Sequence, residues 1–419
     1  MQVLIVGKEA KEYVLAKKIK EQNPDCVVFV APGNQAICDF AVCVDIQATN
    51  AGELVEFAQA NEVNLTIISD YEAIKTGVAD AFNEAGLMVF APEAEASRFC
   101  IFKSVGKKFM YKLKIPTPKF GIFDREIAAR DYVRAASYPI LIKSDEHEAG
   151  ENVFLCHSPK EAENILNKFF IESDKKVVIQ NYISGREFSF YAVTDGYNVL
   201  PVVSVVPYKY ASEKDGGSIT KGVGAYAPCT FADYEIEQKI LNQVIYPALD
   251  EIAKNSSPYV GIIGADVILD NENNISVIEF NPFFKEPDIE CILNLFNTGL
   301  INLFRACIAG SLIDDYDCID IKDRFALSVV LTKIPEKLFD NESSLVTGLE
   351  RLDDEIDVNL YNAVNKNNEI FVKAGRALSL CSSALTLNQA RKNIADNIDC
   401  VEFKGKRIRK DILNINNGC

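Results

Sequence analysis

The chain has 419 residues, of which 48% are hydrophobic and 25% are charged. This is the composition of an ordinary soluble globular protein, long enough for roughly two to four compact units. Its 44 Lys and Arg residues against 60 Asp and Glu residues give a formal net charge of −16. That balance argues against a nucleic-acid partner, whose binding depends on phosphate neutralisation, but it does not exclude small anions. With only two histidines, His-centred acid–base or nucleophilic chemistry is not expected.

The sequence predicts no membrane association and no disulfide framework. No run approaches the roughly 18–20 apolar residues that a membrane span requires. The start, MQVLIVGKEAKEY, lacks a basic region before its short apolar run, which favours a first strand over a signal peptide and predicts a cytoplasmic protein. The twelve cysteines are scattered, and several lie in apolar runs, as Cys43 and Cys307 do. Buried reduced thiols are therefore expected, and a zinc site is not.

The N-terminal part alternates strand and helix patterns. Four short segments are continuously apolar, as buried parallel strands are: 3–6, 27–30, 65–68 and 88–90. Residues 8–23 carry apolar side chains at i,i+4 spacing among Lys and Glu, which predicts an amphipathic helix, and a second helix is predicted at 51–60. Strands that alternate with helices indicate a doubly wound parallel sheet, here an N-terminal domain of residues 1–93.

A mixed α/β domain is predicted for residues 94–320. Its expected elements are a basic helix at 102–114, strands at 138–145, 176–185 and 187–206, a glycine-bearing loop at 207–228, a long helix at 231–255, a hairpin at 261–280 and a helical stretch at 289–310. From Arg324 onward, two strand patterns and a helix pattern at 387–397 predict a smaller α+β unit. Residues 321–419 are therefore expected to form a C-terminal domain.

Two lysines occupy positions where their charge would face a crevice. Lys103 begins the basic helix, and Lys143 ends the apolar pattern YPILIK. A lysine at the end of a buried strand keeps its aliphatic stem in the apolar layer and places its ammonium group beyond it. Both ammonium groups are therefore candidates for binding an anion. A surface lysine that covers apolar surface with its stem is the alternative interpretation.

The segment VIEFN, residues 277–281, carries two oxygen-bearing side chains. Glu279 and Asn281 are two residues apart, and side chains at that spacing project from the same face of a strand. Mg²⁺ prefers oxygen ligands and usually takes only one or two from the protein, with phosphate oxygens and water as the others. The pair is therefore a candidate magnesium site. A solvated or lysine-paired glutamate is the alternative interpretation.

A glycine-rich stretch, KYASEKDGGSITKGVGAY, occupies residues 209–226. Its backbone N–H groups are candidates for cradling an anion, as in flexible phosphate-binding loops. It lacks the order GxxxxGK[ST], so it is not a Walker loop. A plain hairpin connection is the alternative interpretation.

In this order, the strand-end lysine, the glycine-rich stretch and the E-F-N strand resemble an ATP-grasp ligase. Over nearly the whole chain the sequence is similar to the glycinamide ribonucleotide synthetase (phosphoribosylamine–glycine ligase) family. The collinear segments that carry this resemblance are VFVAPGN (28–34), GVADAFNEAGLMVFAP (77–92), KIPTP (114–118), PILIKSD (139–145), GVGAYAP (222–228), VIEFN (277–281) and RKDI (409–412).

The resemblance implies an ATP-dependent ligase of de novo purine biosynthesis that joins glycine to 5-phosphoribosylamine through an acyl phosphate. It implies an ATP-grasp domain over residues 94–320, with a flexible small subdomain at about 115–186 as in the family. ATP and Mg²⁺ (or Mn²⁺) are the implied cofactors, and Glu279 and Asn281 would hold the metal. The protein is expected to act as a monomer or homodimer on small molecules alone.

The resemblance also assigns the nucleotide-binding residues. Lys103 and Lys143 would lie near the ATP phosphates and adenine, and Glu187 would bind the ribose hydroxyls. The backbone around Gln180 and Tyr182 would bind the adenine edge.

Four further positions match the family. Gly7 in the first turn and Asn34 of APGN would lie near the phosphoribosylamine. Lys209 and Asp215, in and near the glycine-rich stretch, are the implied catalytic residues.

The chain departs from the family pattern at several of its motifs. The first turn, GKEAKEY (7–13), replaces three glycines and a histidine, and Glu9 would crowd and repel a ribose phosphate at a helix N-terminus. Glu151 stands where the family has a lysine, and Phe283 where it has an arginine. Lys285 could restore a positive charge beside Phe283, but as a point charge rather than a planar fork.

Three functional interpretations stay open from the sequence. The first is a ligase with the substrates of the family. The second is an ATP-grasp ligase with a different amine or acid substrate, and the third is a non-catalytic nucleotide-binding relative.

Overall fold

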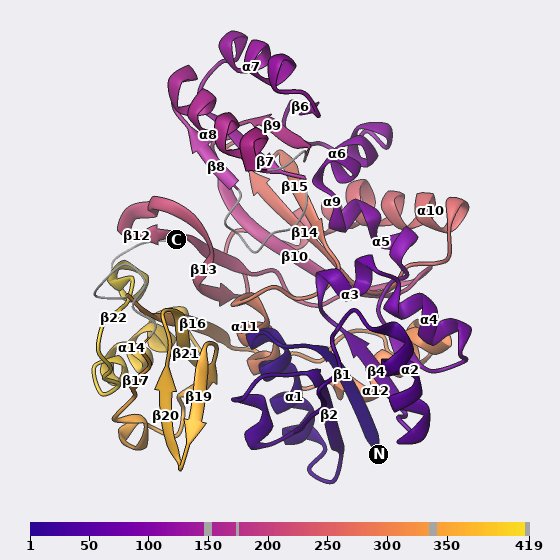
Figure 1. Ribbon diagram of the computed structural model, residues 1–419, viewed down its shortest axis with the longest axis vertical. Coiled ribbons are helices and arrows are strands. Elements are labelled where there is room, and N and C mark those ends of the chain that lie inside the picture. The colour runs from indigo at the N-terminus through magenta and orange to yellow at the C-terminus, as the bar shows by residue number, and fades with distance from the viewer. Residues whose placement is uncertain (146–152, 173–175, 335–341, 415–419) are drawn as a thin grey trace.

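The computed structural model describes residues 1–145, 153–172, 176–334 and 342–414. Glu151 lies outside these described residues, so its predicted proximity to phosphates has no structural counterpart here. Figure 1 shows an N-terminal sheet in indigo, a small layer of strands with α7 and α8 at the top, and C-terminal strands in yellow at the lower left. Within the described ranges, every helix is too short or too polar to cross a membrane.

The N-terminal sheet is parallel and has the expected doubly wound layout. Its strand order is β3 (Val42–Cys43), β2 (Val27–Pro32), β1 (Gln2–Gly7), β4 (Leu65–Ile68) and β5 (Val89–Phe90). Alternate residues of β1 enter different cores: Val3 packs with helix α1 (Ala10–Gln22), and Leu4 packs with the opposite layer. That layer comprises α2 (Ala51–Ala60), α3 (Tyr71–Lys75) and α4 (Val78–Glu84). Burial on both faces explains why these strands read as continuous apolar runs.

The central sheet is antiparallel and carries the predicted hairpin. Its order is β11 (Val199–Pro201), β10 (Arg186–Asp195), β14 (Val260–Leu269) and β15 (Ile275–Asn281). One face packs against α5 (Ala94–Ile101), α6 (Lys103–Lys112), α9 (Tyr234–Ile240) and α10 (Tyr246–Asn255), with a π-helical turn at Leu241–Ile245. The helical stretch expected at 289–310 is two helices, α11 (Asp288–Leu295) and α12 (Leu300–Ala309).

A small antiparallel sheet forms its own layer at the top of Figure 1. Its order is β6 (Phe120–Phe123), β9 (Val177–Asn181), β7 (Ile140–Ser144) and β8 (Val153–Cys156). Helices α7 (Glu126–Ala135) and α8 (Pro159–Glu172) flank it. This layer has a separate apolar core. It places the ends of β7 and β9 above the central sheet.

The prediction of a glycine-bearing loop at 207–228 is wrong, because most of these residues form two long strands. They are β12 (Val206–Ser212) and β13 (Gly216–Ala227), in the sheet order β12-β13-β16-β21-β18. The glycines serve close strand contact: a Cβ at Gly224 would lie 2.7 Å from the Ser328 carbonyl oxygen. A Cβ at Gly222 would lie 2.5 Å from Pro287 Cδ. The glycine pattern thus reflects packing rather than an open loop.

The C-terminal strands complete this sheet. They are β16 (Phe325–Lys333), β21 (Gly375–Ala384), β18 (Asp357–Leu360) and β22 (Lys406–Arg407), with α14 (Leu387–Ile398) packed on them. A separate ribbon joins β17 (Ser344–Leu345), β20 (Glu369–Val372) and β19 (Ala363–Lys366). Helix α13 (Leu312–Asp315) and the 3-10 turns Ile37–Asp39, Glu213–Asp215, Leu349–Arg351 and Lys410–Leu413 are the remaining elements of the described residues. The sheet crosses the sequence boundary predicted at residue 320, and the domain limits stay predictions.

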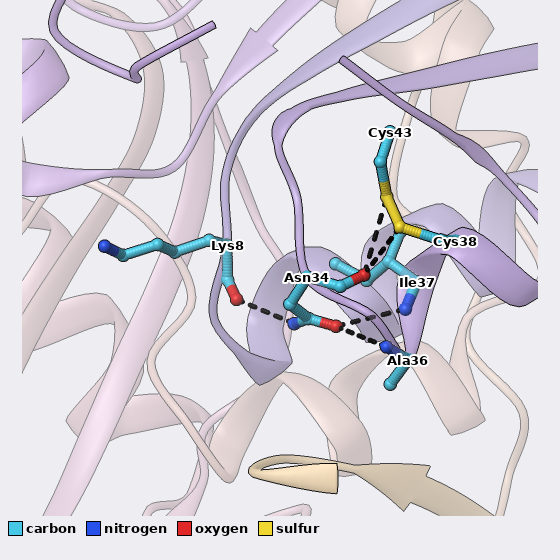
Figure 2. Close-up of a disulfide and its surroundings, with 6 residues drawn as sticks. All are labelled: Lys8, Asn34, Ala36, Ile37, Cys38 and Cys43. Carbon is cyan, nitrogen blue, oxygen red and sulfur yellow. Dashed lines mark hydrogen bonds between the residues drawn. A yellow bond between two sulfur atoms is a disulfide. The ribbon is translucent and has the colours of Figure 1, made fainter. Parts of the chain in front are cut away.

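The expectation of reduced thiols is wrong at one place. Cys38, in the connection between β2 and β3, forms a disulfide with Cys43 of β3, and Figure 2 shows this bond beside Asn34. Neither of the two cysteines is fully buried, and their Cα atoms are 5.4 Å apart, a normal separation for bonded cysteines. Cys307 is buried and free, as expected.

Candidate functional site

A cavity of about 350 Å³ is lined by residues of the small sheet, the central sheet, the β12–β13 strands and the starts of α1 and α3. This volume lies in the range of small-molecule sites. Its walls carry an unusual number of charged side chains. They include Lys103, Lys143, Lys209, Lys285, Glu187 and Glu279.

The predicted lysines Lys103 and Lys143 meet Glu279 in this cavity. Lys143 ends β7 as expected, is almost fully buried, and places its Nζ 3.8 Å from Glu279 Oε2. Burial lowers the pKa of Lys143, and the nearby Glu279 carboxylate opposes that shift. Burial likewise lowers the pKa of Lys103 to about 8, again against the effect of Glu279. The chain thus keeps two cations and one carboxylate at low solvent exposure in one site.

Glu279 and Asn281 share one face of β15, but only Glu279 lines the cavity. The Glu279 side chain is 20% exposed, whereas Asn281 is fully buried. Asn281 Nδ2 donates to Asp266 Oδ1 at 3.2 Å, and Asn281 Oδ1 accepts from the Tyr71 hydroxyl at 3.3 Å. The amide is therefore held in place by its neighbours.

The donor set on β15 fits Mg²⁺. Glu279 and Asn281 both offer hard oxygen atoms, and Mg²⁺ needs only one or two protein ligands when phosphates supply the others. Within the described ranges, no group of three or more His, Cys, Asp or Glu side chains could hold a metal ion by itself. A metal in this cavity would consequently depend on phosphate oxygens.

Asp266 is a functional candidate that the sequence analysis missed. It lies on β14 directly opposite Glu279 and is fully buried. Lys285 Nζ donates to both of its oxygens, at 2.6 and 2.5 Å, and Lys209 Nζ donates to Oδ2 at 2.9 Å. Burial raises the pKa of Asp266, but the two ammonium groups outweigh it and lower the pKa to about 2. The available signal was one charged residue within the apolar strand GIIGADVIL.

Lys209 also contacts Glu187, so the predicted catalytic and ribose-binding residues are neighbours. Burial lowers the pKa of Lys209, but Asp266 and Glu187 raise it well above the ordinary value. Gln180 lines the cavity, is 1% exposed, and has no hydrogen-bond partner for either side-chain amide atom within the described part of the chain. Tyr182 lies beside it, exposed on the wall. An unpartnered buried amide of this kind is expected to bind a ligand.

Besides Asn281, three predicted residues do not line this cavity, namely Asp215, Gly7 and Asn34. Asp215 lies at the turn between β12 and β13 and pairs with Arg409 at 2.8 Å. Gly7 ends β1 with a φ of +145°, and a Cβ there would lie 2.5 Å from the Glu12 carboxylate carbon, so glycine is required for packing. The roles assigned to both residues stay untested.

Asn34 organises the loop between β2 and β3, as Figure 2 shows. Its Nδ2 donates to the Lys8 carbonyl at 2.7 Å, and its Oδ1 accepts from the backbone N–H groups of Ala36 and Ile37 at 3.0 and 3.1 Å. The side chain therefore fixes the β1–α1 turn next to the cavity without lining the cavity itself. Its predicted contact with an amine substrate stays untested.

The N-terminus of α1 is filled by the chain's own carboxylates. Glu9 is the N-cap residue, and its carboxylate contacts Lys11 Nζ at 2.7 Å and Lys221 Nζ at 2.9 Å. The Lys11 backbone N–H donates to Glu286 Oε1 at 2.8 Å, and Arg376 pairs with the other Glu286 oxygen. Charges that would otherwise attract an external anion at this helix end are thus already paired.

Phe283 lines the cavity between Tyr71 and Lys11. Phe283 is 4% exposed, and its ring centroid lies 4.4 Å from the ring centroid of Tyr71. Lys11 Nζ lies 5.1 Å from the centroid of the Phe283 ring. Lys285 follows two residues later and reaches Asp266 instead. The expectation that Lys285 restores a positive charge beside Phe283 stays untested.

Two family models match the chain in succession. The model for the phosphoribosylglycinamide synthetase N domain matches residues 1–99, and that for its ATP-grasp (A) domain matches residues 102–291. Solved structures agree in fold. The phosphoribosylamine–glycine ligase of Thermotoga maritima has a TM-score of 0.81 at 22% identity, covering 98% of this chain and 100% of that one. The biotin carboxylase domain of a Hydrogenobacter thermophilus 2-oxoglutarate carboxylase, solved with MgADP, has a TM-score of 0.74 at 15% identity, covering 97% and 91%.

Sequence relatives extend over the full length. The phosphoribosylamine–glycine ligase of Pasteurella multocida is 31% identical over 98% of this chain and 97% of its own. That of Halalkalibacterium halodurans is 30% identical over 98% of this chain and 96% of its own. The chain therefore belongs to the phosphoribosylamine–glycine ligase family of ATP-grasp proteins.

Proposed function

We propose that this chain is an ATP-dependent carboxylate–amine ligase that joins glycine to 5-phosphoribosylamine in purine biosynthesis. Family membership over 98% of the chain supports the reaction class. The observation that carries the proposal is the cavity in which Lys103, Lys143 and Lys209 face Glu187 and Glu279. Such a set suits a nucleotide triphosphate, whose charge requires several cations and whose metal requires a carboxylate.

The two walls of the cavity suggest how the nucleotide lies. Gln180, Tyr182 and Glu187 offer an amide, an aromatic ring and a carboxylate, which suit an adenine base and its ribose hydroxyls. Lys143 lies 3.8 Å from Glu279, and Lys103 lines the cavity close to the same carboxylate, so the phosphates would be neutralised there. We therefore assign the first group to the adenosine and the second to the phosphate chain.

The reaction consists of two transfers. A carboxylate oxygen of glycine attacks the γ-phosphorus of ATP, the bond to the β–γ bridging oxygen breaks, and ADP leaves. The amine nitrogen then attacks the carbonyl carbon of the acyl phosphate, loses a proton, and inorganic phosphate leaves. The protein contributes positioning and charge neutralisation rather than covalent chemistry.

We assign the metal to Glu279, which lines the cavity, and to Asn281, which lies on the same face of β15 and whose Oδ1 would exchange the Tyr71 hydroxyl for the ion. When bound, Mg²⁺ would neutralise charge on the phosphate oxygens. Lys143 already partners Glu279 across 3.8 Å, so it would hold that carboxylate in position.

The direct test is a reaction with purified full-length protein. We expect ADP and inorganic phosphate to form only when ATP, Mg²⁺, glycine and 5-phosphoribosylamine are all present, with glycinamide ribonucleotide detected by mass spectrometry. A Glu279→Ala variant should lose this turnover. Binding of ATP without any product in the complete mixture would contradict the proposal.

A second candidate is a ligase with an amine substrate that lacks a ribose phosphate. The position of Glu9 favours this candidate. Its carboxylate pairs with Lys11 and Lys221 at the N-terminus of α1, so these two cations are already engaged where a ribose phosphate would bind. A screen of amines and amino acids for ADP formation separates the two candidates. Strict dependence on 5-phosphoribosylamine would exclude the second one.

We further propose a cytoplasmic monomer or homodimer that binds no nucleic acid. The net charge of −16 supports the last point. The Cys38–Cys43 disulfide is unusual for a reducing compartment, so its redox state in cells is informative about location. Light scattering after size-exclusion chromatography measures the oligomeric state directly.

A further inference from the structure

Two lysine side chains from distant parts of the chain share one buried carboxylate. Lys209 on β12 and Lys285, just before α11, both donate to Oδ2 of Asp266, at 2.9 and 2.5 Å. Lys285 also donates to Oδ1 at 2.6 Å. The two ammonium groups are consequently held side by side at one position in the fold.

The cations face the cavity, and the carboxylate lies behind them. Asp266 is fully buried, whereas the side chains of Lys209 and Lys285 are 21% and 18% exposed and line the cavity wall. Asp266 neutralises one ammonium group and Glu187, which also pairs with Lys209, neutralises the other, so these four groups are formally neutral. Both ammonium groups lie on the cavity side of Asp266, where an anion can reach them.

The arrangement is fixed from behind by further hydrogen bonds. The Ser189 hydroxyl donates to Asp266 at 2.9 Å, and Asn281 donates to it at 3.2 Å. The Lys285 backbone N–H donates to the Tyr191 hydroxyl at 3.3 Å, and that hydroxyl donates to Asp288 at 2.8 Å. A carboxylate with this many partners holds its lysines in one geometry, which lowers the entropic cost of binding an anion.

We propose that Lys209 and Lys285, positioned by Asp266, form a two-ammonium clamp for the terminal phosphoryl group of the nucleotide. Asp266 is the positioning residue, and the two lysines contact the phosphoryl oxygens. The clamp supplies positive charge at the group that is transferred, where Phe283 offers none.

The location favours the terminal phosphoryl group over other anions. Asp266 lies directly opposite Glu279 in the β14–β15 register, and Lys209 also contacts Glu187. Lys285 and Asp266 therefore lie beside the carboxylate assigned above to the metal, where the phosphate chain is expected, and Lys209 reaches toward the ribose side. This inference builds on the proposed ATP-dependent reaction, but it predicts nucleotide binding irrespective of the amine substrate.

Calorimetry with two nucleotides tests the clamp. ADP lacks the terminal phosphoryl group, so a Lys285→Met variant should bind MgADP within about twofold of the unmodified protein. The same variant should bind the Mg²⁺ complex of the β,γ-methylene analogue of ATP about 10- to 100-fold more weakly, which is the range for loss of a charged hydrogen bond. Lys285→Arg keeps the charge and should recover part of this affinity.

A matched control is Lys254→Met, because Lys254 is exposed on α10 and distant from the cavity lining. It should change neither affinity. Asp266→Asn should reproduce the selective loss for the ATP analogue; since a buried substitution can impair folding, Lys285→Met remains the decisive variant.

Several results would overturn the clamp. One is that Lys285→Met binds MgADP and the ATP analogue equally more weakly, and another is that it binds both as tightly as the unmodified protein does. A third is a rise in the KM for glycine while the affinity for both nucleotides is unchanged. The last result would assign the lysines to the substrate carboxylate. If Lys285→Met loses affinity for the ATP analogue alone, but the unmodified protein forms no glycinamide ribonucleotide, the clamp stands and the proposed function fails.

Discussion

The two ends of the cavity treat charge in opposite ways. At the β14–β15 end, Lys103, Lys143, Lys209 and Lys285 outnumber the carboxylates of Glu187, Glu279 and Asp266, and the lysines line the wall. At the α1 end, Glu9 and Glu286 pair with the cations that surround them. The same fold thus has one lysine more than these three carboxylates at one end, whereas Glu9 and Glu286 are fully engaged by cations at the other.

This difference separates two binding problems within one site. An anion that enters the β14–β15 end meets lysines that Asp266, Glu187 and Glu279 already hold on the cavity wall, so few side chains have to be reoriented. An anion that enters the α1 end must displace Glu9 from Lys11 and Lys221, and this exchange costs the ion pairs that it breaks. Phosphate recognition is therefore expected to be strong for the nucleotide and weak for the amine substrate.

The largest effect is expected at Glu279. Glu279→Gln removes the charge opposite Lys143 and the oxygen donor assigned to the metal, so ADP formation should fall by about 100-fold or more. Mg²⁺-dependent nucleotide binding, measured by calorimetry, should weaken in parallel. The control is Glu272→Gln, an exposed residue in the turn of the same hairpin. If nucleotide binding by Glu279→Gln still depended on Mg²⁺ as in the unmodified protein, the assignment of Glu279 to the metal would be wrong.

A stability effect is expected at Glu290 on α11, near the α1 end. Burial raises the pKa of Glu290 to about 7, although hydrogen bonds from Ser328, Ser379 and Tyr361 oppose the shift. A raised carboxyl pKa means that the folded state binds this proton more tightly than the unfolded state. Stability from this group is therefore present below the ordinary pKa and is lost as the pH rises through about 7.

Between pH 5 and 8 that loss should amount to roughly 2–3 kcal/mol, and Glu290→Gln should abolish it. Urea unfolding at both pH values measures the effect. The quantity to compare is the change in unfolding free energy between the two pH values, in the unmodified protein and in the variant. An identical pH dependence in both proteins would show that the buried carboxyl does not titrate in this range.

A smaller effect concerns the pH dependence of nucleotide binding. Because burial lowers the pKa of Lys103 to about 8, its ammonium group loses its charge as the pH rises above that value. The kcat/KM for ATP should therefore decrease above pH 8, by up to about tenfold per pH unit. Lys103→Arg keeps its charge and should flatten this limb. Lys108→Arg, on the exposed face of the same helix, is the control and should leave the limb intact.

The smallest effect is expected at the α1 end. Glu9→Gln removes the internal carboxylate charge while keeping a side-chain oxygen for the helix cap. Ribose 5-phosphate, a sugar phosphate without the reactive amine, should then bind about 3- to 10-fold more tightly, since Lys11 and Lys221 become available. Glu53→Gln, in the first turn of α2, is the control. Weaker binding in Glu9→Gln would mean that the two ends do not differ as described.

The sequence predicts the parts of this site that depend on local pattern. The apolar strand before Lys143 and the alternation around Glu279 both place a polar group where a buried strand meets a cavity. Strand periodicity alone carries that information. The parallel sheet and the β14–β15 hairpin were predictable for the same reason.

The parts that depend on long-range contacts could not be predicted. Asp266 is paired by lysines 57 and 19 residues away, and no local pattern encodes that meeting. The glycines of β13 allow contact with β16, about a hundred residues later, and so resemble a loop when read alone. The Cys38–Cys43 bond was missed because a cysteine within an apolar run suggested burial, whereas the loop is partly exposed.

The sheet shared by β12, β13 and the C-terminal strands has a further consequence. Gly224–Ala227 form their ladder with Ala326–Val329, so the strand beside the one that carries Lys209 is completed by residues beyond the predicted central domain. A chain cut at residue 320 would expose an unpaired strand edge and invite aggregation. Two separately produced halves should recover activity only when they recombine through the β13–β16 ladder.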